Sequence, residues 1–142
     1  MLNSLKLFVL VFSVLVFAGY NANAQCNAET LSTQCIPKLA SGFNFLKSYK
    51  VEKAGKDYVE YSYVFTKGTQ YMINVCASEQ NPDGIVVTLY DSKRNKVASN
   101  KVDDQYTAAI AYPCNSTGIY YIQYTFDNTA IACGGSALGF KR

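Results

Sequence analysis

Residues 58–76, YVEYSYVFTKGTQYMINVC, contain two alternating runs that decide the fold class. In 58–66 an apolar side chain occupies every second position, and 70–76 repeat this alternation after the short polar stretch at 67–69. Alternation is typical of a half-buried β-strand, because successive side chains of a strand point to opposite faces. A short turn between two such runs predicts a β-hairpin.

The same pattern continues on both sides of these two runs. Turn-forming Gly, Pro, Asn and Asp residues separate the runs, and no long helical period occurs. About eight short strands of this kind predict an all-β fold, an antiparallel β-sandwich of the jelly-roll-like type. Leu46 and Lys47 interrupt the first run and predict a β-bulge. The other runs occupy residues 43–51, 85–90, 96–99, 106–112, 118–126 and 137–140.

The N-terminal segment has the three parts of a secretory signal peptide. Lys6 supplies the positive start, residues 7–18 form the apolar stretch, and Ala22 and Ala24 precede a cleavage point. The apolar stretch is shorter than the ~20 residues that span a membrane. We therefore expect a secreted mature chain (extracellular, periplasmic or at the cell surface) without a membrane span. The expected segments are a cleaved signal helix at 1–24, a disulfide-tied N-terminal arm at 25–40 and a β-sandwich domain at 41–142.

The composition excludes several classes of function. The 142 residues leave room for one domain. Histidine is absent from the sequence, which removes Ser-His-Asp triads, Cys-His dyads and His-ligated metal sites. The formal charge of +3, or +2 once Lys6 is removed, is too weak for a protein that neutralises nucleic-acid phosphates. We therefore expect no catalysis and no nucleic-acid partner.

Five cysteines in the expected mature region predict disulfides, because an exported chain meets an oxidising compartment. Cys26 and Cys35 are expected to form one bridge that ties the arm, since only eight residues lie between them. Two of Cys76, Cys114 and Cys133 are expected to form the second bridge, and the sequence leaves the three pairings open. The remaining thiol is either buried and inert, or it links two chains into a disulfide-bonded dimer.

Four aspartates, Asp83, Asp91, Asp103 and Asp104, are the candidate calcium ligands. Loop carboxylates supply the hard oxygen atoms that calcium prefers. Aspartate is also common in turns simply because its side chain accepts hydrogen bonds from nearby backbone N–H groups. No calcium-loop motif of the DxDxDG kind occurs. We therefore expect no obligatory cofactor, with calcium as the alternative.

Tyr58, Tyr90 and Tyr121 are the candidate binding residues. They fall on the strand parity opposite to that of the apolar core residues. If that parity faces water, the three form an exposed aromatic surface that offers stacking faces and phenolic hydroxyls to a sugar or a peptide. The alternative is that tyrosine only fills strand positions, or that the sheet is covered on both faces. The basic run at 93–96 is interpreted as a solvated hairpin tip.

Three short motifs within residues 58–126 resemble one family of bacterial domains. The motifs are Gly68-Thr69-Gln70-Tyr71, Leu89-Tyr90-Asp91 and Gly118-Ile119-Tyr120-Tyr121. Their order resembles that of the pre-peptidase C-terminal domains, and the Asn-Ala-Asn-Ala-Gln stretch at 21–25 is similar to the signal endings of secreted Bacteroidetes proteins. The resemblance implies a jelly-roll-like sandwich without catalysis of its own. Family members usually accompany secreted enzymes and help their secretion or substrate attachment, whereas this chain has room for one domain and carries more cysteines.

The sequence therefore leads to three hypotheses about function. The first is a secreted, non-catalytic domain that binds an extracellular carbohydrate or protein at the cell surface. The second is a disulfide-stabilised structural protein of the envelope or matrix. The third is a calcium-dependent accessory domain that acts in trans on a separate chain.

Overall fold

The computed structural model describes residues 26–78, 82–127, 131 and 133–142, so the expected signal segment at 1–24 lies outside the described residues. None of the described helices is long and apolar enough to cross a membrane. The described elements are α2 (Ala28–Cys35), η1 (Ile36–Lys38), β1 (Asn44–Glu52), β2 (Val59–Phe65), β3 (Gln70–Cys76), β4 (Ile85–Tyr90), β5 (Lys96–Ser99), β6 (Lys101–Val102), β7 (Gln105–Tyr106), β8 (Ala109–Pro113), β9 (Gly118–Phe126) and β10 (Cys133–Lys141).

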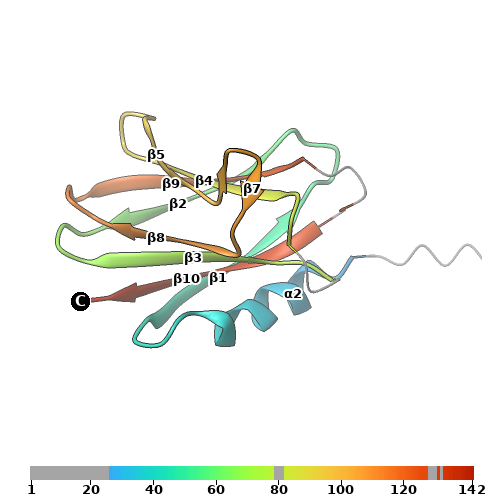
Figure 1. The fold of residues 1–142 in the computed structure, drawn as a ribbon, viewed down its shortest axis with the longest axis horizontal. Helices are drawn as coiled ribbons and strands as arrows, with labels where there is room; N and C mark the ends of the chain where they lie inside the picture. Colours follow the sequence, from blue (N-terminus) through green and yellow to red (C-terminus); the bar gives the residue numbers. More distant parts are fainter. Residues whose placement is uncertain (1–25, 79–81, 128–130, 132) are drawn as a thin grey trace, which may run out of the picture.

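The strands form an antiparallel β-sandwich of two four-stranded sheets, which confirms the predicted fold class (Figure 1). One sheet has the order β1-β10-β3-β8 and the other β2-β9-β4-β5, while β6 and β7 pair with each other in a separate two-stranded sheet. Helix α2 packs on the outer face of the first sheet, where it contacts β10, β1 and β3. The outer face of the second sheet carries exposed side chains such as Ser62, Val64 and Ile119.

The core between the sheets has an aromatic centre. Phe65 stacks on Tyr71, with ring centroids 3.8 Å apart, and on Tyr120, with centroids 4.7 Å apart. Tyr124 donates a hydrogen bond of 2.6 Å to Ser136 Oγ across the sandwich. All five side chains are buried. The tyrosines on the core parity therefore point inward, as the alternation of the sequence predicts.

The predicted hairpin of the runs at 58–66 and 70–76 is wrong. β2 and β3 belong to different sheets, and the stretch at 67–69 crosses from one to the other. The backbone of this stretch bonds to the β8–β9 connection, where the Gly68 N–H donates to the Cys114 carbonyl at 2.9 Å. Alternation fixes which face of each strand is buried, but it does not fix which strand pairs with it.

The predicted run at 106–112 is divided between two strands. Tyr106 ends the β6–β7 hairpin, and β8 begins only at Ala109. Thr107 turns the chain between them, because its N–H donates to the carbonyl of the buried Asn100 at 2.8 Å. The structure therefore adds a short hairpin to the eight strands that the sequence predicts.

The bulge that the sequence predicts in the first strand is confirmed. The register of β1 against β10 shifts between Phe45 and Lys47. Before the shift the Phe45 side chain is 45% exposed, whereas Tyr49 and Val51 after it are buried. Because the bulge adds one residue to β1, the odd-numbered side chains after it, such as Tyr49 and Val51, point to the core.

The N-terminal arm is a helix that lies on the sheet. Asn27 caps its start, since Asn27 Oδ1 accepts a 3.0 Å hydrogen bond from the Thr30 N–H. The capped end is followed by a buried stripe at helical spacing. The sequence shows no clear apolar period here because two members of the stripe are a serine and a cysteine. The stripe consists of Ala28, Leu31, Ser32 and Cys35.

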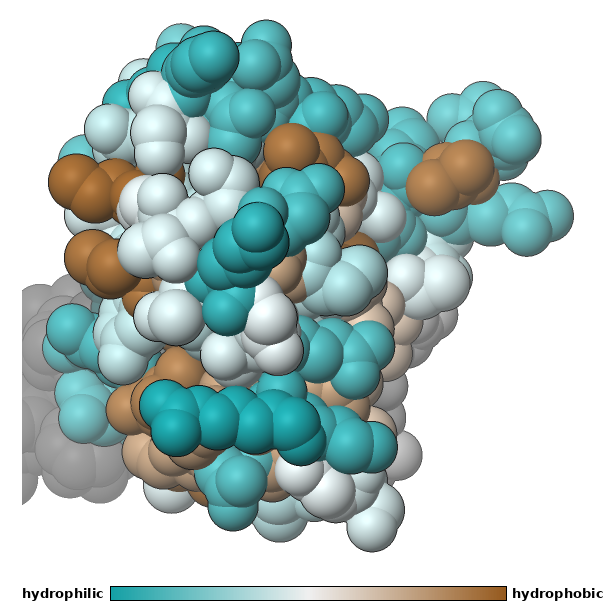
Figure 2. Space-filling model, turned by 90° about the vertical axis from the view of Figure 1, so that its left-hand side faces the viewer, coloured by the Kyte–Doolittle hydropathy of each residue, from teal (hydrophilic) through white to brown (hydrophobic). Residues whose placement is uncertain are grey.

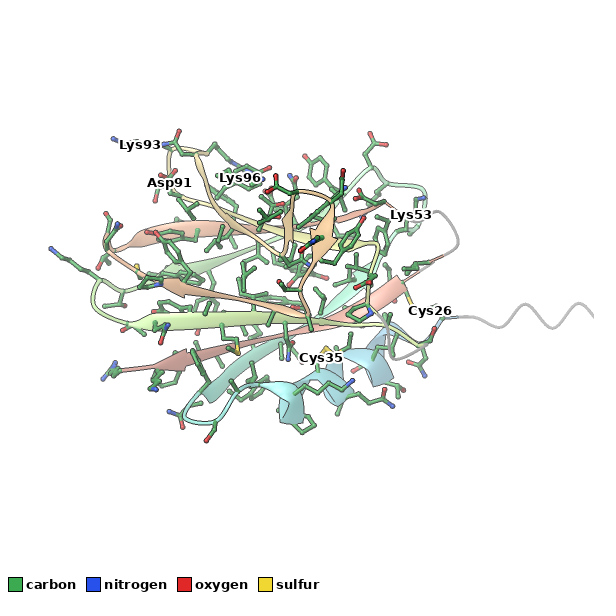
Figure 3. The ribbon with its side chains drawn as sticks, viewed as in Figure 1. Cys26, Cys35, Lys53, Asp91, Lys93 and Lys96 are labelled. Atoms are coloured by element: carbon green, nitrogen blue, oxygen red, sulfur yellow. A yellow bond between two sulfur atoms is a disulfide. The ribbon has the colours of Figure 1, made fainter. Side chains whose placement is uncertain are left out.

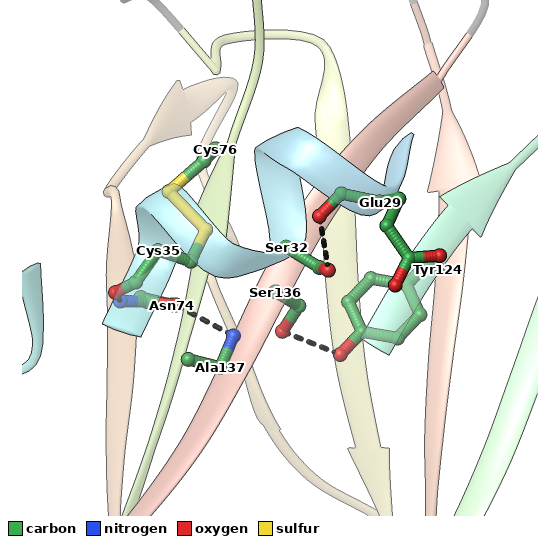
Figure 4. Close-up of a disulfide and its surroundings, with 8 residues drawn as sticks. All are labelled: Glu29, Ser32, Cys35, Asn74, Cys76, Tyr124, Ser136 and Ala137. Carbon is green, nitrogen blue, oxygen red and sulfur yellow. Dashed lines mark hydrogen bonds between the residues drawn. A yellow bond between two sulfur atoms is a disulfide. The ribbon is translucent and has the colours of Figure 1, made fainter. Parts of the chain in front are cut away.

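The predicted Cys26–Cys35 bridge is wrong. Cys26 is bonded to Cys133 and Cys35 to Cys76, each pair with a Cα–Cα distance of 5.8 Å. Figure 4 shows the Cys35–Cys76 bridge. Cys26 and Cys35 flank opposite ends of α2, and a helix of this length spans about 12 Å, which is too far for a disulfide. Each end of α2 is instead tied to a different strand of the sheet beneath it.

The fifth cysteine, Cys114, is a buried free thiol. Its Sγ donates to the Ser116 carbonyl at 3.2 Å and lies 3.7 Å from the Tyr120 hydroxyl. Both disulfides are internal to the chain. The structure therefore gives no support to a dimer linked through the odd cysteine.

Candidate functional site

The second sheet presents a regular outer surface, which we call the tyrosine face. Cross-strand register places Tyr121 of β9 opposite Tyr90 of β4 on one side and Ser62 of β2 on the other. The neighbouring pair on the same face, two residues further along β2, is Val64 opposite Ile119. The tyrosine face is defined here as Tyr58, Glu60, Ser62, Val64, Thr88, Tyr90, Ile119, Tyr121 and Gln123, together with Arg94, whose side chain lies over it.

Arg94 crosses this face from the β4–β5 connection. Its guanidinium carbon lies 3.6 Å from the centroid of the Tyr121 ring, and its Nη1 lies 2.8 Å from Glu60 Oε2. Glu60 also accepts a 3.3 Å hydrogen bond from Gln123 Nε2. The hydrogen bond from Arg94 to Glu60 raises the pKa of the guanidinium above its ordinary value, and the nearby Tyr121 and Tyr58 add to this effect. Two strands, β2 and β9, and the β4–β5 connection thus meet at one charged, aromatic cluster.

The hairpin holds Arg94 in an unusual backbone conformation. Its φ is +65°, in the left-handed region that glycine or asparagine usually occupies. Asp91 organises the turn, because its Oδ1 accepts hydrogen bonds of 2.9 Å from the N–H groups of both Lys93 and Asn95. These bonds, the one from the Asn95 backbone first, lower the pKa of the Asp91 carboxyl. Figure 3 shows Asp91 and Lys93 at this outer end of the sandwich.

The three tyrosines predicted from parity all lie on the uncovered sheet, but they are not equivalent. Tyr58 precedes β2 and is 50% exposed. Tyr90 and Tyr121 are partly buried. One ring face of Tyr121 is covered by the Arg94 guanidinium, so it is not an open platform for a sugar.

Sequence reasoning misses Arg94 as a functional residue, because a short basic run such as 93–96 is typical of a solvated hairpin tip. Figure 3 shows Lys93 at the tip as expected, whereas Arg94 folds back over the sheet. One sequence signal was present: the five-residue connection 91–95 contains no glycine for its left-handed position.

The four candidate calcium ligands have no common centre. Asp83 and Asp91 flank opposite ends of β4, whereas Asp103 and Asp104 form the β6–β7 turn with φ of +50° and +60°. Asp104 also forms a 3.5 Å ion pair with Lys101. Within the described ranges no three His, Cys, Asp or Glu side chains are close enough to hold a metal ion. Calcium binding therefore stays a prediction, which loss of thermal stability on chelation would test.

The end of the sandwich next to the β4–β5 connection is mostly polar. A cleft of about 350 Å³ opens there between the β4–β5 and β8–β9 connections, and its lining includes Lys93, Asn95, Asn115 and Tyr112. Figure 2 shows this end of the molecule, where hydrophobic residues form separate small patches on a hydrophilic or neutral surface. This end therefore lacks one continuous apolar contact area.

Solved structures that are similar to this β-sandwich include the following two. One is PliG of Aeromonas hydrophila, a periplasmic inhibitor of g-type lysozyme, with a TM-score of 0.46 and 14% sequence identity, covering 70% of this chain and 87% of that chain. The other is the pre-peptidase C-terminal domain of a collagenase from Bacillus anthracis, with a TM-score of 0.47 and 17% identity, covering 68% of this chain and 90% of that chain. The second belongs to the family that the three sequence motifs resemble. No protein-family model and no curated protein matches the sequence.

Proposed function

We propose that this chain is an exported, non-catalytic domain that binds a protein partner through the tyrosine face. The observation that carries the proposal is the cluster of Arg94, Tyr121 and Glu60 on the sheet face that α2 leaves open. Arginine and tyrosine are the side chains that most often dominate the binding energy of protein interfaces. A rigid guanidinium held over an aromatic ring loses little side-chain entropy when a partner binds.

The surroundings of the cluster favour a protein over a carbohydrate. Val64 and Ile119 are 57% and 48% exposed and lie in the row next to Tyr121, so they offer apolar side chains beside the cluster. A sugar-binding platform needs an open ring face, and Arg94 covers one face of Tyr121. Carbohydrate binding, the other half of the sequence hypothesis, is therefore an outcome that the experiment must separate.

Two further features support an exported domain without catalysis. The two disulfides fit an oxidising compartment outside the cytosol. The acids of the site have structural partners: Glu60 pairs with Arg94, and Asp91 holds its own turn. No general base is available from histidine, which the sequence lacks.

The proposal is tested by capture on the immobilised full chain. The exported fraction of the source cells and a panel of polysaccharides are offered to the wild-type protein and to the Arg94→Ala and Tyr121→Ala variants. We expect a specific protein to be retained, with at least about tenfold weaker binding by each variant. Lys38→Ala, at an exposed residue on the α2 side of the molecule, is the matched control and should bind as the wild type does.

Three outcomes would contradict the proposal. Retention of a polysaccharide that Tyr121→Ala abolishes would make the face a carbohydrate site. Protein capture that neither variant weakens would place the interface elsewhere. Absence of any retained protein would favour the structural hypothesis over a binding function.

A further inference from the structure

Strand β8 has an open edge. Among the strands that the structure describes, it is the last of its sheet and pairs only with β3. The Val75 N–H donates to the Ala108 carbonyl at 2.9 Å, and the Cys114 N–H donates to the Thr69 carbonyl at 3.0 Å, which sets the phase of the ladder. Because hydrogen bonds alternate along an antiparallel pair, the backbone groups of Ala109 and Ala111 point away from β3.

This edge lacks the charges that protect the other edges of the sandwich. Edge strands normally carry charged side chains that prevent another strand from adding to them. β1 carries Lys47 and Lys50, β2 carries Glu60, and β5 carries Lys96 and an irregular register against β4. β8 reads AIAYP, without a charge, and its register against β3 is regular.

A groove of about 590 Å³ runs beside the open edge. One side is formed by β8, and the facing side by Ala98, Ser99 and Asn100 at the edge of β5. The β6–β7 hairpin forms a wall with Val102, Asp103 and Gln105. Figure 1 shows the chain passing from the upper sheet through this hairpin down to β8.

The hairpin wall is held in place by side-chain contacts. Lys101 Nζ and the Tyr106 hydroxyl both donate to Asp127 Oδ2, at 2.5 Å and 2.9 Å. At the base of the hairpin, Asn100 Nδ2 donates to the Thr107 carbonyl at 3.1 Å. The groove is therefore a feature of the fold rather than a gap beside a loose loop.

We propose that this groove accepts an extended segment of a partner polypeptide, which adds as a strand to the edge of β8. The bond donors are the N–H groups of Ala109 and Ala111, and the Ala111 carbonyl is the acceptor; the Ala109 carbonyl already accepts from Thr107 Oγ1 at 3.0 Å. Addition ends at Pro113, which has no N–H to offer.

The lining selects the chemistry of the segment. Many of the lining side chains are alanine, serine or threonine. Because these side chains are short, small residues at alternate positions of an added strand have space to pack against them. Asp103 is exposed at the rim and has no ion-pair partner among the described residues, so a basic residue of the segment complements it. The β6–β7 hairpin contributes Val102, Asp103 and Gln105 to the groove beside this edge.

The test follows backbone amides by NMR in the full chain as the peptide KTATATK is added. We expect shifts and slowed hydrogen exchange at the N–H groups of Ala109 and Ala111. The amides of Ile110 and Tyr112 point to β3 and are protected before and after addition. The same peptide, N-methylated at alternate residues, keeps its side chains but loses its donors, and should bind about tenfold more weakly.

Two variants keep the test independent of folding defects. Ala111→Pro removes one donor at an outward-facing edge position, and Ala111→Lys adds an edge charge at an exposed site. Both should abolish the shifts, whereas Asn44→Lys, at an exposed position of β1 that belongs to neither proposed surface, should not. Shifts confined to the tyrosine face, none at millimolar peptide, or none that respond to N-methylation would overturn the proposal. Shifts that grow with protein concentration alone would show pairing of two copies and overturn it as well.

Discussion

Arg94 stands where a hairpin of this kind usually places glycine. Its φ of +65° is a left-handed backbone conformation, which is energetically unfavourable for a residue with a side chain. In this conformation the side chain contacts the ring of Tyr121 and the carboxylate of Glu60. Backbone strain that persists in a folded protein often marks a site where a side chain must be presented in one direction. Arg94 is therefore both a turn residue and the centre of the candidate site.

This double role predicts a difference between two truncations at position 94. Arg94→Gly and Arg94→Ala remove the same contacts, but only alanine keeps the strained backbone. We expect the glycine variant to be the more stable of the two by about 1 kcal/mol in urea unfolding. Both should lose partner binding equally. Equal stabilities would show that the turn relaxes without cost, and retained binding in the glycine variant would remove Arg94 from the interface.

Asn100 is the buried polar residue that joins the second sheet to the β6–β7 hairpin. Its Oδ1 accepts from the Val87 N–H at 2.8 Å, and its Nδ2 donates to the carbonyls of Ile85 and Thr107 at 3.0 and 3.1 Å. Asn100→Ala would leave three backbone groups without partners. We expect a loss of about 3 kcal/mol in the free energy of unfolding, measured with urea.

The matched control for this change is Asn115→Ala, at an exposed loop residue, which should shift stability by less than about 0.5 kcal/mol. If Asn100→Ala costs no more than the control, water replaces the amide and the hairpin does not depend on it.

At the scale of elements, helix α2 approaches its sheet more closely than ordinary side chains allow. A Cβ on Gly135 of β10 would overlap the backbone of Leu31 and Ser32. The helix end is further fixed by Asn74, whose Nδ2 donates to the Cys35 carbonyl and whose Oδ1 accepts from the Ala137 N–H, both at 2.8 Å (Figure 4). Gly135, the Asn74 amide and the two disulfides thus hold helix α2 against two strands, β10 and β3.

Gly135→Ala tests this close contact. The added methyl must displace α2, and overpacking of this kind costs about 1–3 kcal/mol. We expect faster amide exchange across 28–35, while the disulfides keep the helix attached. Exchange in β2 and β9 serves as the internal control and should not change. Unchanged exchange in α2 would mean that β10 shifts instead of the helix.

The elements also show what the sequence can predict. Alternation located the strands and their buried faces, as for Phe65 and Tyr124, because side-chain burial is a local property of a strand. It could not predict that β2 pairs with β9, because pairing depends on residues far away in the chain. The prediction of the disulfide pairing is wrong for the same reason. The short spacing suggests a bridge between Cys26 and Cys35, but a helix separates the two residues, and each is bonded to a distant strand.

The candidate site was predictable only in part. Parity placed Tyr58, Tyr90 and Tyr121 on the uncovered sheet, because it is again a local rule. It could not show that Arg94 returns over Tyr121, since that depends on the φ of one turn residue and on Glu60 two strands away. The site combines a predictable surface with an unpredictable turn.

At the scale of the whole molecule, the core is rich in tyrosine, and we therefore expect the free energy of unfolding to fall at alkaline pH. Burial raises the pKa of Tyr124 well above its ordinary value of about 10, and burial likewise raises the pKa of Tyr49 and Tyr120. In the unfolded chain these hydroxyls ionise near pH 10. The folded state therefore keeps its full advantage below pH 10 and loses it as the pH rises toward the folded pKa values.

For Tyr124 alone the expected loss is about 1.4 kcal/mol per pH unit above pH 10, and Tyr49 and Tyr120 act in the same direction. We expect the tyrosinate absorbance of the three buried rings to appear together with unfolding, followed by circular dichroism. Tyr124→Phe should reduce the slope of stability against pH. Ser136→Ala removes the same 2.6 Å hydrogen bond but keeps the ionisable ring, so it should lower stability at neutral pH without reducing the slope. Equal slopes in the two variants would mean that Tyr124 ionises inside the folded core, and that the core admits water.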